Sequence, residues 1–196
     1  MIRTIFLAAP GAGKGTQAEK VAAKFGAVPI STGDALRLAL AERTPIGLQA
    51  KEFMDAGELV PDEVVLTIVQ DKLRSTDATG WILDGFPRNK SQAISLEKVL
   101  TELEQDKCLV IYLEVEDEIL IERIAGRYKE LGRKDDADPN TVANRLEIYK
   151  EETLPLIKFY SQQNILRTVN GNRSVDHVFD EICLIIKEFF ALEYRE

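Results

Sequence analysis

A glycine-rich turn near the N-terminus lies between an apolar run and a stretch with helical spacing. The apolar run is Thr4–Ala9, residues 18–25 carry the helical spacing, and the turn between them reads Gly11-Ala12-Gly13-Lys14-Gly15-Thr16. Such a turn directs backbone N–H groups and a helix dipole at an anion. Lys14 can reach the terminal phosphates as a point charge. The turn therefore predicts a site for a nucleoside triphosphate.

The turn departs from the strict phosphate-loop pattern G-x-x-x-x-G-K-[ST]. Ala8 stands where the first glycine would be, and Gly15 follows Lys14, so that Thr16 comes one place late. We expect the phosphate-facing amides to be retained in spite of Ala8, because the later glycines, the lysine and the threonine are all present. The alternative interpretation is an incidental glycine-rich turn.

Five short apolar runs along the chain predict buried strands, with helical patterns between them. Strands that do not alternate between apolar and polar residues indicate a parallel sheet covered on both faces, hence an α/β fold. Ligands of such sheets bind at the carboxyl ends of the strands. The predicted strands are Thr4–Ala9, Ala27–Ile30, Gly80–Leu83, Leu109–Leu113 and Ile165–Val169.

Two segments interrupt this alternation. Residues 31–60 carry helical signals and no strand, which predicts a helical insert after the second strand. Residues 128–138 are polar and charged, and we interpret them as a short mobile loop between two helices. Asp138 and Pro139 end this loop, since Asp is a good helix cap and Pro suits a first helical position.

Several arginines lie where a helix does not favour a cation. We expect Asp34 to cap a helix whose first turn contains Arg37, and Arg88 lies near the start of another helix. Each placement opposes the helix dipole by about 0.3–1 kcal/mol. Arg123 and Arg127 lie four apart on one helix, which is mildly repulsive. An anionic ligand would offset these costs, and two further candidates for the same cluster are Arg133 and Arg145.

Asp84 ends the predicted strand Gly80–Leu83. A carboxylate at the end of a parallel strand beside a phosphate loop is the expected partner of Mg²⁺, through water. The alternative role of Asp84 is to cap the segment that follows.

Composition restricts the class of protein. The 196 residues suffice for one domain with a full core, and we expect it to be cytoplasmic because no apolar stretch is long enough to cross a bilayer. The formal charge of −8 argues against broad nucleic-acid or anionic-membrane binding. Cys108 and Cys183 have apolar neighbours and are expected to be reduced core residues. His177 is expected at the surface.

Together these residues resemble the adenylate kinases, within the nucleoside-monophosphate kinase family. The resemblance spans nearly the whole chain, and its stretches are residues 9–17, 31–37, 55–60 and 84–88, Gln92, residues 123–127 and 133–136, and Arg145. It implies a P-loop three-layer fold with a five-stranded parallel sheet, a helical AMP-binding insert and a short lid without zinc-ribbon cysteines. The implied division is core at 1–30, insert at 31–60, core at 61–125, lid at 126–137 and core at 138–196.

The resemblance also implies roles for individual residues. ATP would be held by Gly11, Ala12, Gly13, Lys14, Gly15, Thr16, Arg123 and Arg127, with Gly171 and Arg173 beside its adenine. AMP would be held by Thr32, Arg37, Gly57, Glu58, Leu59, Val60, Gly85, Arg88, Gln92, Arg133 and Arg145. The residues expected to act on the transferring phosphoryl group are Lys14, Arg88, Arg123, Arg127, Arg133 and Arg145.

The implied reaction is MgATP + AMP ⇌ 2 ADP, with Mg²⁺ held through Asp84 and water, and with no zinc. Thr32 and Gln92 favour AMP over the acceptor of a UMP/CMP kinase, because Gln can hydrogen-bond a purine edge. A GTPase would need Asp where Gln92 follows Asn89-Lys90-Ser91. A non-catalytic nucleotide-binding module has no reason to keep the lid arginines. We expect a monomer whose partners are ATP, AMP and ADP, without nucleic acid or membrane.

Overall fold

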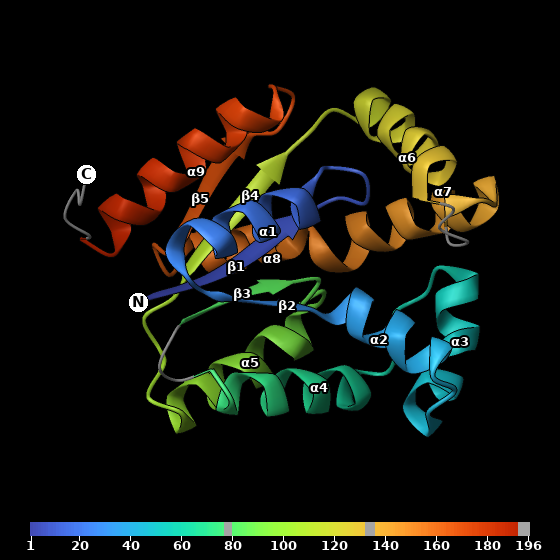
Figure 1. Cartoon of the computed structure of the whole chain (residues 1–196), viewed down its shortest axis with the longest axis horizontal. Helices are drawn as coiled ribbons and strands as arrows, with labels where there is room; N and C mark the ends of the chain where they lie inside the picture. Colours follow the sequence, from blue (N-terminus) through green and yellow to red (C-terminus); the bar gives the residue numbers. More distant parts are fainter. Residues whose placement is uncertain (77–79, 132–135, 192–196) are drawn as a thin grey trace.

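The molecule is built on a five-stranded parallel sheet in the order β2-β3-β1-β4-β5 (Figure 1). This computed structural model describes residues 1–76, 80–131 and 136–191. The predicted α/β fold is confirmed, and each observed strand begins and ends within two residues of the predicted one. The strands are β1 (Ile2–Ala8), β2 (Val28–Ser31), β3 (Gly80–Asp84), β4 (Leu109–Glu114) and β5 (Leu166–Asn170).

Helices cover both faces of the sheet, and the residues of β1 show how the two layers divide. Ile5 and Leu7 pack with the first group of helices, whereas Phe6 and Ala8 pack with the second. This alternation is that of a strand buried on both sides. The first group is α4 (Asp62–Arg74), α5 (Lys90–Glu102) and α8 (Pro155–Ser161), and the second is α1 (Lys14–Phe25) and α9 (Val175–Phe189).

The segment after β2 forms two helices, α2 (Thr32–Ala41) and α3 (Pro45–Ala56). They pack closely, because a Cβ atom added to Gly47 would lie 2.2 Å from the backbone of Ala39. The predicted cap of α2 is wrong. Ser31, not Asp34, is the N-cap, and its hydroxyl accepts a hydrogen bond from the Asp34 N–H at 3.2 Å. The helix begins directly where β2 ends, which leaves Asp34 inside the first turn.

After β4, α6 (Asp117–Leu131) and α7 (Pro139–Ile148) flank the segment predicted as a loop. Residues 128–131 are helical, so the loop begins later than predicted, because polar residues such as Lys and Glu are good helix formers. Residues 132–135 lie outside the described part of the chain. The end of the loop agrees with the prediction, since Asp138 caps α7 by accepting the Asn140 N–H at 3.1 Å.

The cysteines and the histidine lie where the sequence predicts. Cys108 and Cys183 are free and buried, and burial raises the pKa of the Cys108 thiol to about 12. His177 is exposed on α9, where its ring contacts Ser174. Within the described ranges, no helix has both the length and the apolar character that a bilayer-spanning helix needs.

Candidate functional site

The glycine-rich turn leads from β1 into α1 at the carboxyl edge of the sheet (Figure 1). Gly11 and Gly13 have φ of +87° and +86°, a left-handed conformation that favours glycine. A Cβ atom on Gly11 would also lie 2.8 Å from the Leu120 carbonyl and from the Ile124 side chain. Helix α6 therefore packs directly against the turn, and the turn opens toward solvent at the start of α1.

Ala8 is the last residue of β1 and pairs with Leu113 of β4. It is buried, and it is not among the residues with positive φ in the described part of the chain. A side chain is compatible with that backbone, so the departure from the strict phosphate-loop pattern requires no change in the turn. The two positions that need glycine come after it.

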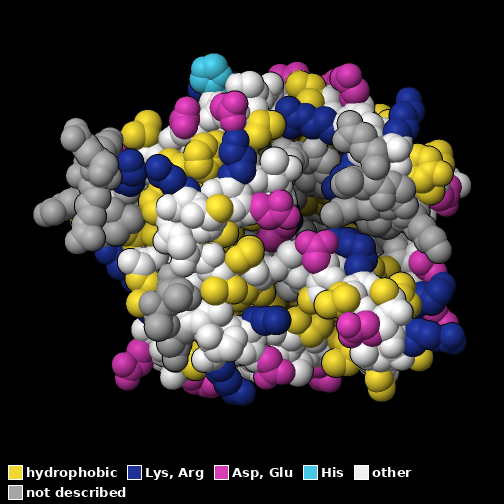
Figure 2. All heavy atoms as spheres, in the orientation of Figure 1, with side chains coloured by type: hydrophobic (Ala, Val, Ile, Leu, Met, Phe, Trp, Pro, Cys, Tyr) yellow, Lys and Arg dark blue, Asp and Glu magenta, His cyan; other side chains and the backbone are white. Residues whose placement is uncertain are grey.

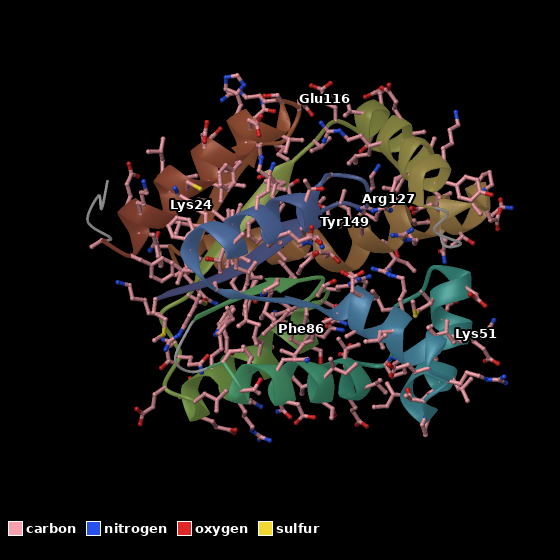
Figure 3. The ribbon with its side chains drawn as sticks, in the orientation of Figure 1. Lys24, Lys51, Phe86, Glu116, Arg127 and Tyr149 are labelled. Carbon is pink, nitrogen blue, oxygen red and sulfur yellow. The ribbon has the colours of Figure 1, made fainter. Side chains whose placement is uncertain are left out.

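The turn forms one wall of a wide cleft with a volume of about 720 Å³. The cleft extends from the turn to α6 and to the segment after β5, and Arg127 lies on the side of α6 that faces it (Figure 3). Arg123 donates from Nη1 to the carbonyl of Ala12 at 3.4 Å, so that its guanidinium lies against the turn. The cleft is lined by the sequence-predicted residues Gly11, Ala12, Gly13, Lys14, Gly15, Thr16, Asp84, Arg123, Arg127, Gly171 and Arg173.

Lys14 and Asp84 form an ion pair across the base of the wide cleft. Asp84 ends β3, the strand next to β1, so parallel pairing places its carboxylate beside the turn. Gly15 is close to the pair as well, since a Cβ atom there would lie in van der Waals contact with Asp84, 3.4 Å from its Oδ2. Asp84 is not a helix cap, since α5 is capped by Asn89.

Asp136 holds two arginines at the side of the wide cleft, and the sequence did not predict this. Its carboxylate accepts from Arg127 Nε at 2.6 Å, from Arg127 Nη2 at 2.7 Å and from Arg145 Nη1 at 2.7 Å. Burial raises the pKa of the Asp136 carboxyl, but the two guanidinium groups lower it more, so the net pKa lies below the ordinary Asp value. The carboxylate keeps two cations close together that would otherwise repel.

A second, small pocket with a volume of about 80 Å³ opens between α2, α3, α4 and the residues that follow β3. Thr32 donates from Oγ1 to the Gly85 carbonyl at 3.0 Å, and Arg88 donates from Nε to the same carbonyl at 2.8 Å. Gly85 has φ of +86°, and a Cβ atom there would lie 2.8 Å from Thr32 Oγ1. The sequence-predicted residues that line the small pocket are Thr32, Arg37, Gly57, Glu58, Leu59, Val60, Gly85, Arg88, Gln92 and Arg145.

The sequence reasoning missed the apolar wall of the small pocket, which includes Leu36, Met54 and Val65. Their spacing within helical segments indicates burial, but nothing in the pattern separates a residue facing a ligand from one facing the core. Arg133, predicted for this site, lies outside the described residues.

The two pockets meet along a row of arginines. Arg37, Arg88 and Arg145 line both the small pocket and the wide cleft. Arg37 is paired with Asp34 at 2.5 Å, one turn earlier on α2. Two of the arginines that oppose their helix dipoles, Arg37 and Arg88, therefore meet Arg145 at one boundary, which suits an anionic group lying between two ligands.

Comparison with known proteins agrees with this geometry. A family model described as adenylate kinase matches residues 6–165. An adenylate kinase from Synechococcus sp. (strain JA-2-3B'a(2-13)) is 50% identical over 96% of this chain and 98% of the relative. One from Thermodesulfovibrio yellowstonii is 42% identical over 95% and 100%, and one from Leptospira biflexa is 48% identical over 93% and 98%. A phosphate loop, two adjoining pockets and these matches establish that the chain belongs to the adenylate kinase family.

Proposed function

We propose that this chain catalyses MgATP + AMP ⇌ 2 ADP with ATP in the wide cleft and AMP in the small pocket. As a member of the adenylate kinase family, the chain is a phosphotransferase that acts between adenine nucleotides. The observation that carries the assignment of the pockets is their shared boundary of Arg37, Arg88 and Arg145. A phosphoryl group passing from one nucleotide to the other would cross that boundary.

The reaction needs positioning and charge neutralisation rather than a base. The acceptor is a phosphate oxygen, which is largely deprotonated at pH 7 because the second pKa is about 6. His177, the single histidine, lies exposed on α9 and has no part in the transfer. Lys14 would hold the terminal phosphates of ATP, and Arg88, Arg123, Arg127, Arg133 and Arg145 would stabilise the charge of the transferring group.

The donor atoms in the wide cleft fit Mg²⁺ bound to ATP. Asp84 supplies a carboxylate, the kind of hard oxygen ligand that Mg²⁺ takes directly or through water, and it faces the phosphate loop. The metal would neutralise charge on the phosphates. The same carboxylate pairs with Lys14, so the residue that would hold the metal lies beside the residue that would hold the terminal phosphates.

Water must be kept from competing with AMP as the acceptor. We propose that residues 31–60 form an AMP-binding insert and residues 126–137 a short lid, each closing over its nucleotide before transfer. The division of the chain supports this. After β2 the chain leaves the sheet as α2 and α3 and returns to it through α4, and the proposed lid runs from the end of α6 to the start of α7 (Figure 1).

We further propose a cytoplasmic monomer without nucleic-acid partners. The net charge of −8 supports the absence of nucleic-acid partners, as does the distribution of charge. On the face shown in Figure 2, basic and acidic side chains are interspersed, whereas a nucleic-acid site presents a basic stripe or patch.

The assay that tests the acceptor assignment measures nucleoside diphosphate formation from MgATP with AMP, CMP or UMP. We expect kcat/KM to be highest for AMP. A higher value for CMP or UMP would show that the small pocket takes a pyrimidine nucleotide, and the fold would be unaffected by that outcome.

A further inference from the structure

The amide group of Gln92 lines the small pocket, and the protein holds both of its ends. Gln92 is buried, with 2% of its surface exposed. Its Oε1 accepts from the backbone N–H of Arg88 at 2.7 Å, and its Nε2 donates to Asp62 Oδ1 at 2.8 Å. Asp62 is the first residue of α4 and is not among the described residues that line the pocket. It therefore contacts the Gln92 amide from the side that faces away from the pocket.

These two hydrogen bonds fix which way the Gln92 amide points. If the amide were reversed, Nε2 would face the Arg88 N–H and Oε1 would face the Asp62 carboxylate, and both contacts would be repulsive. A backbone N–H can only donate and an ionised carboxylate can only accept, so neither partner can adapt. The polarity of the amide is thus set by the protein before any ligand binds.

Asp62 is itself held in place. Asn89 donates from Nδ2 to the same Asp62 oxygen at 3.1 Å, and its own Oδ1 caps α5 by accepting the Gln92 N–H at 2.8 Å. The carboxylate also lies in the first turn of α4, where the helix dipole favours a negative charge. Asp62 is therefore fixed from two helices, α4 and α5.

After these bonds, one hydrogen on Nε2 and one lone pair on Oε1 of Gln92 remain for a ligand. A 6-aminopurine such as adenine offers an acceptor at N1 and a donor at its 6-amino group, which match this pair. A 6-oxopurine such as hypoxanthine offers the reverse, a donor at N1 and an acceptor at O6. The fixed amide would complement the first base at both atoms and oppose the second at both.

We propose that Asp62 is a positioning residue that sets the polarity of the Gln92 amide and thereby selects 6-aminopurine over 6-oxopurine nucleotides in the small pocket. The inference rests on the proposed function, since it requires the acceptor nucleotide to bind there. It assigns to Asp62, a residue outside the small pocket, an effect on which purine base the pocket accepts.

The test compares AMP and IMP as acceptors, with MgATP as the phosphoryl donor and with ADP and IDP separated by chromatography. The quantity measured is the ratio of kcat/KM for AMP to kcat/KM for IMP. Asp62→Ala should lower this ratio about tenfold, because the amide loses one of its two constraints. The change should come from KM, which rises for AMP and falls for IMP, whereas kcat for AMP stays nearly constant.

Two variants separate the hydrogen bond from the charge. Asp62→Asn keeps an oxygen that can accept from Gln92 and Asn89, so its ratio should stay within about twofold of the wild type. Asp62→Ser removes the fixed acceptor, because a hydroxyl can donate or accept, and should lower the ratio about fivefold even if Asp62→Ala does not fold. Glu63→Ala removes the exposed neighbouring carboxylate of the same turn and should leave the ratio unchanged.

AMP and IMP carry the same phosphate. Loss of the Asp62 charge therefore changes the electrostatic interaction with both nucleotides equally and leaves the ratio of their kcat/KM values constant. The inference is overturned if Asp62→Ala, or Asp62→Ser in its place, lowers activity on AMP and IMP equally. It is also overturned if Asp62→Asn loses as much selectivity as Asp62→Ser. A wild-type protein that fails to phosphorylate AMP would instead overturn the proposed function, so the two failures are distinct.

Discussion

The small pocket and the wide cleft hold their polar side chains in different ways. In the small pocket, directional hydrogen bonds hold the recognition side chains: Thr32 and Arg88 donate to the Gly85 carbonyl, and Gln92 accepts from a backbone N–H and donates to Asp62. In the wide cleft, carboxylates hold cations, as in the Lys14–Asp84 pair and around Asp136. The arrangement in the small pocket fixes a pattern of hydrogen bonds, and the arrangement in the wide cleft holds positively charged side chains in position.

This difference predicts a difference in what each site does. Directional hydrogen bonds discriminate between bases, because a mismatch leaves buried polar groups unpaired. Cations held by carboxylates discriminate little, but they stabilise developing charge strongly when a phosphate replaces the carboxylate. We therefore expect substitutions in the wide cleft to lower turnover most, and those in the small pocket to act more through the acceptor.

The largest effect is expected for Lys14→Ala. Removing this charge from the phosphate loop should lower kcat/KM for ATP on the order of a thousandfold, because charge stabilisation is the main catalytic contribution in phosphoryl transfer. Steady-state kinetics with saturating AMP would measure it. Lys20→Ala is the matched control, since Lys20 lies on the same helix and pairs with Asp176 at 2.6 Å. Equal losses in the two variants would contradict the assignment of Lys14 to the phosphates.

A smaller but still severe effect is expected for Arg88→Ala at the boundary of the pockets. Turnover should fall on the order of a hundredfold, while the far-UV circular dichroism and the thermal midpoint stay close to the wild type. Arg74→Ala, at the exposed end of α4, serves as the control. Near-normal kinetics in Arg88→Ala would contradict the assignment of this arginine as a clamp on the acceptor. It would also weaken the difference drawn between the small pocket and the wide cleft.

The third effect is on stability and depends on pH. Asp136→Asn removes the carboxylate that pairs with Arg127 and Arg145, so it should lower the free energy of unfolding at pH 7 by about 2 kcal/mol. Because the pKa of Asp136 is lower in the folded than in the unfolded protein, its stabilisation is fully present above the ordinary Asp pKa of about 3.9. It is lost as pH falls through the lower, folded value.

Urea denaturation of both proteins from pH 7 downward measures this difference. The gap between wild type and Asp136→Asn should be widest near neutral pH and should narrow below about pH 4. Asp71→Asn, on the exposed side of α4, should change the free energy of unfolding by less than about 0.5 kcal/mol. A gap that stays constant down to acid pH would mean that Asp136 is not ionised in the folded protein.

The sequence was sufficient for the sheet and for the turn, because both depend on local pattern. An unbroken apolar run such as Leu109–Leu113 can only be satisfied by burial on both faces, and the observed β4 is one residue longer. The cap of α2 was wrong for a nonlocal reason. Ser31 and Asp34 can both cap a helix, and the choice depends on where β2 ends, which its pairing with β3 determines.

Asp62 and Asp136 show what the sequence could not reveal. Each is one carboxylate among many, and its partner is a side chain on another element. Asp62 meets Gln92 across the α4–α5 contact, and Asp136 joins α6 to α7 through Arg127 and Arg145. Acidic residues near a helix start favour an exposed cap or a dipole contact. Only the packing of the helices distinguishes these two from the rest.

The smallest effect is expected for Ala8→Gly, which would restore the strict phosphate-loop pattern. Ala8 is buried at the end of β1 and pairs with Leu113, so glycine there should lower the free energy of unfolding by about 1 kcal/mol. The KM for ATP should stay within about twofold, because the left-handed conformation belongs to Gly11 and Gly13. Gly13→Ala, the reverse exchange at φ +86°, should raise this KM more, although the added Cβ meets open space. Much tighter ATP binding by Ala8→Gly would contradict this expectation. It would show that the backbone conformation at residue 8, rather than charge, limits the affinity of the turn for ATP.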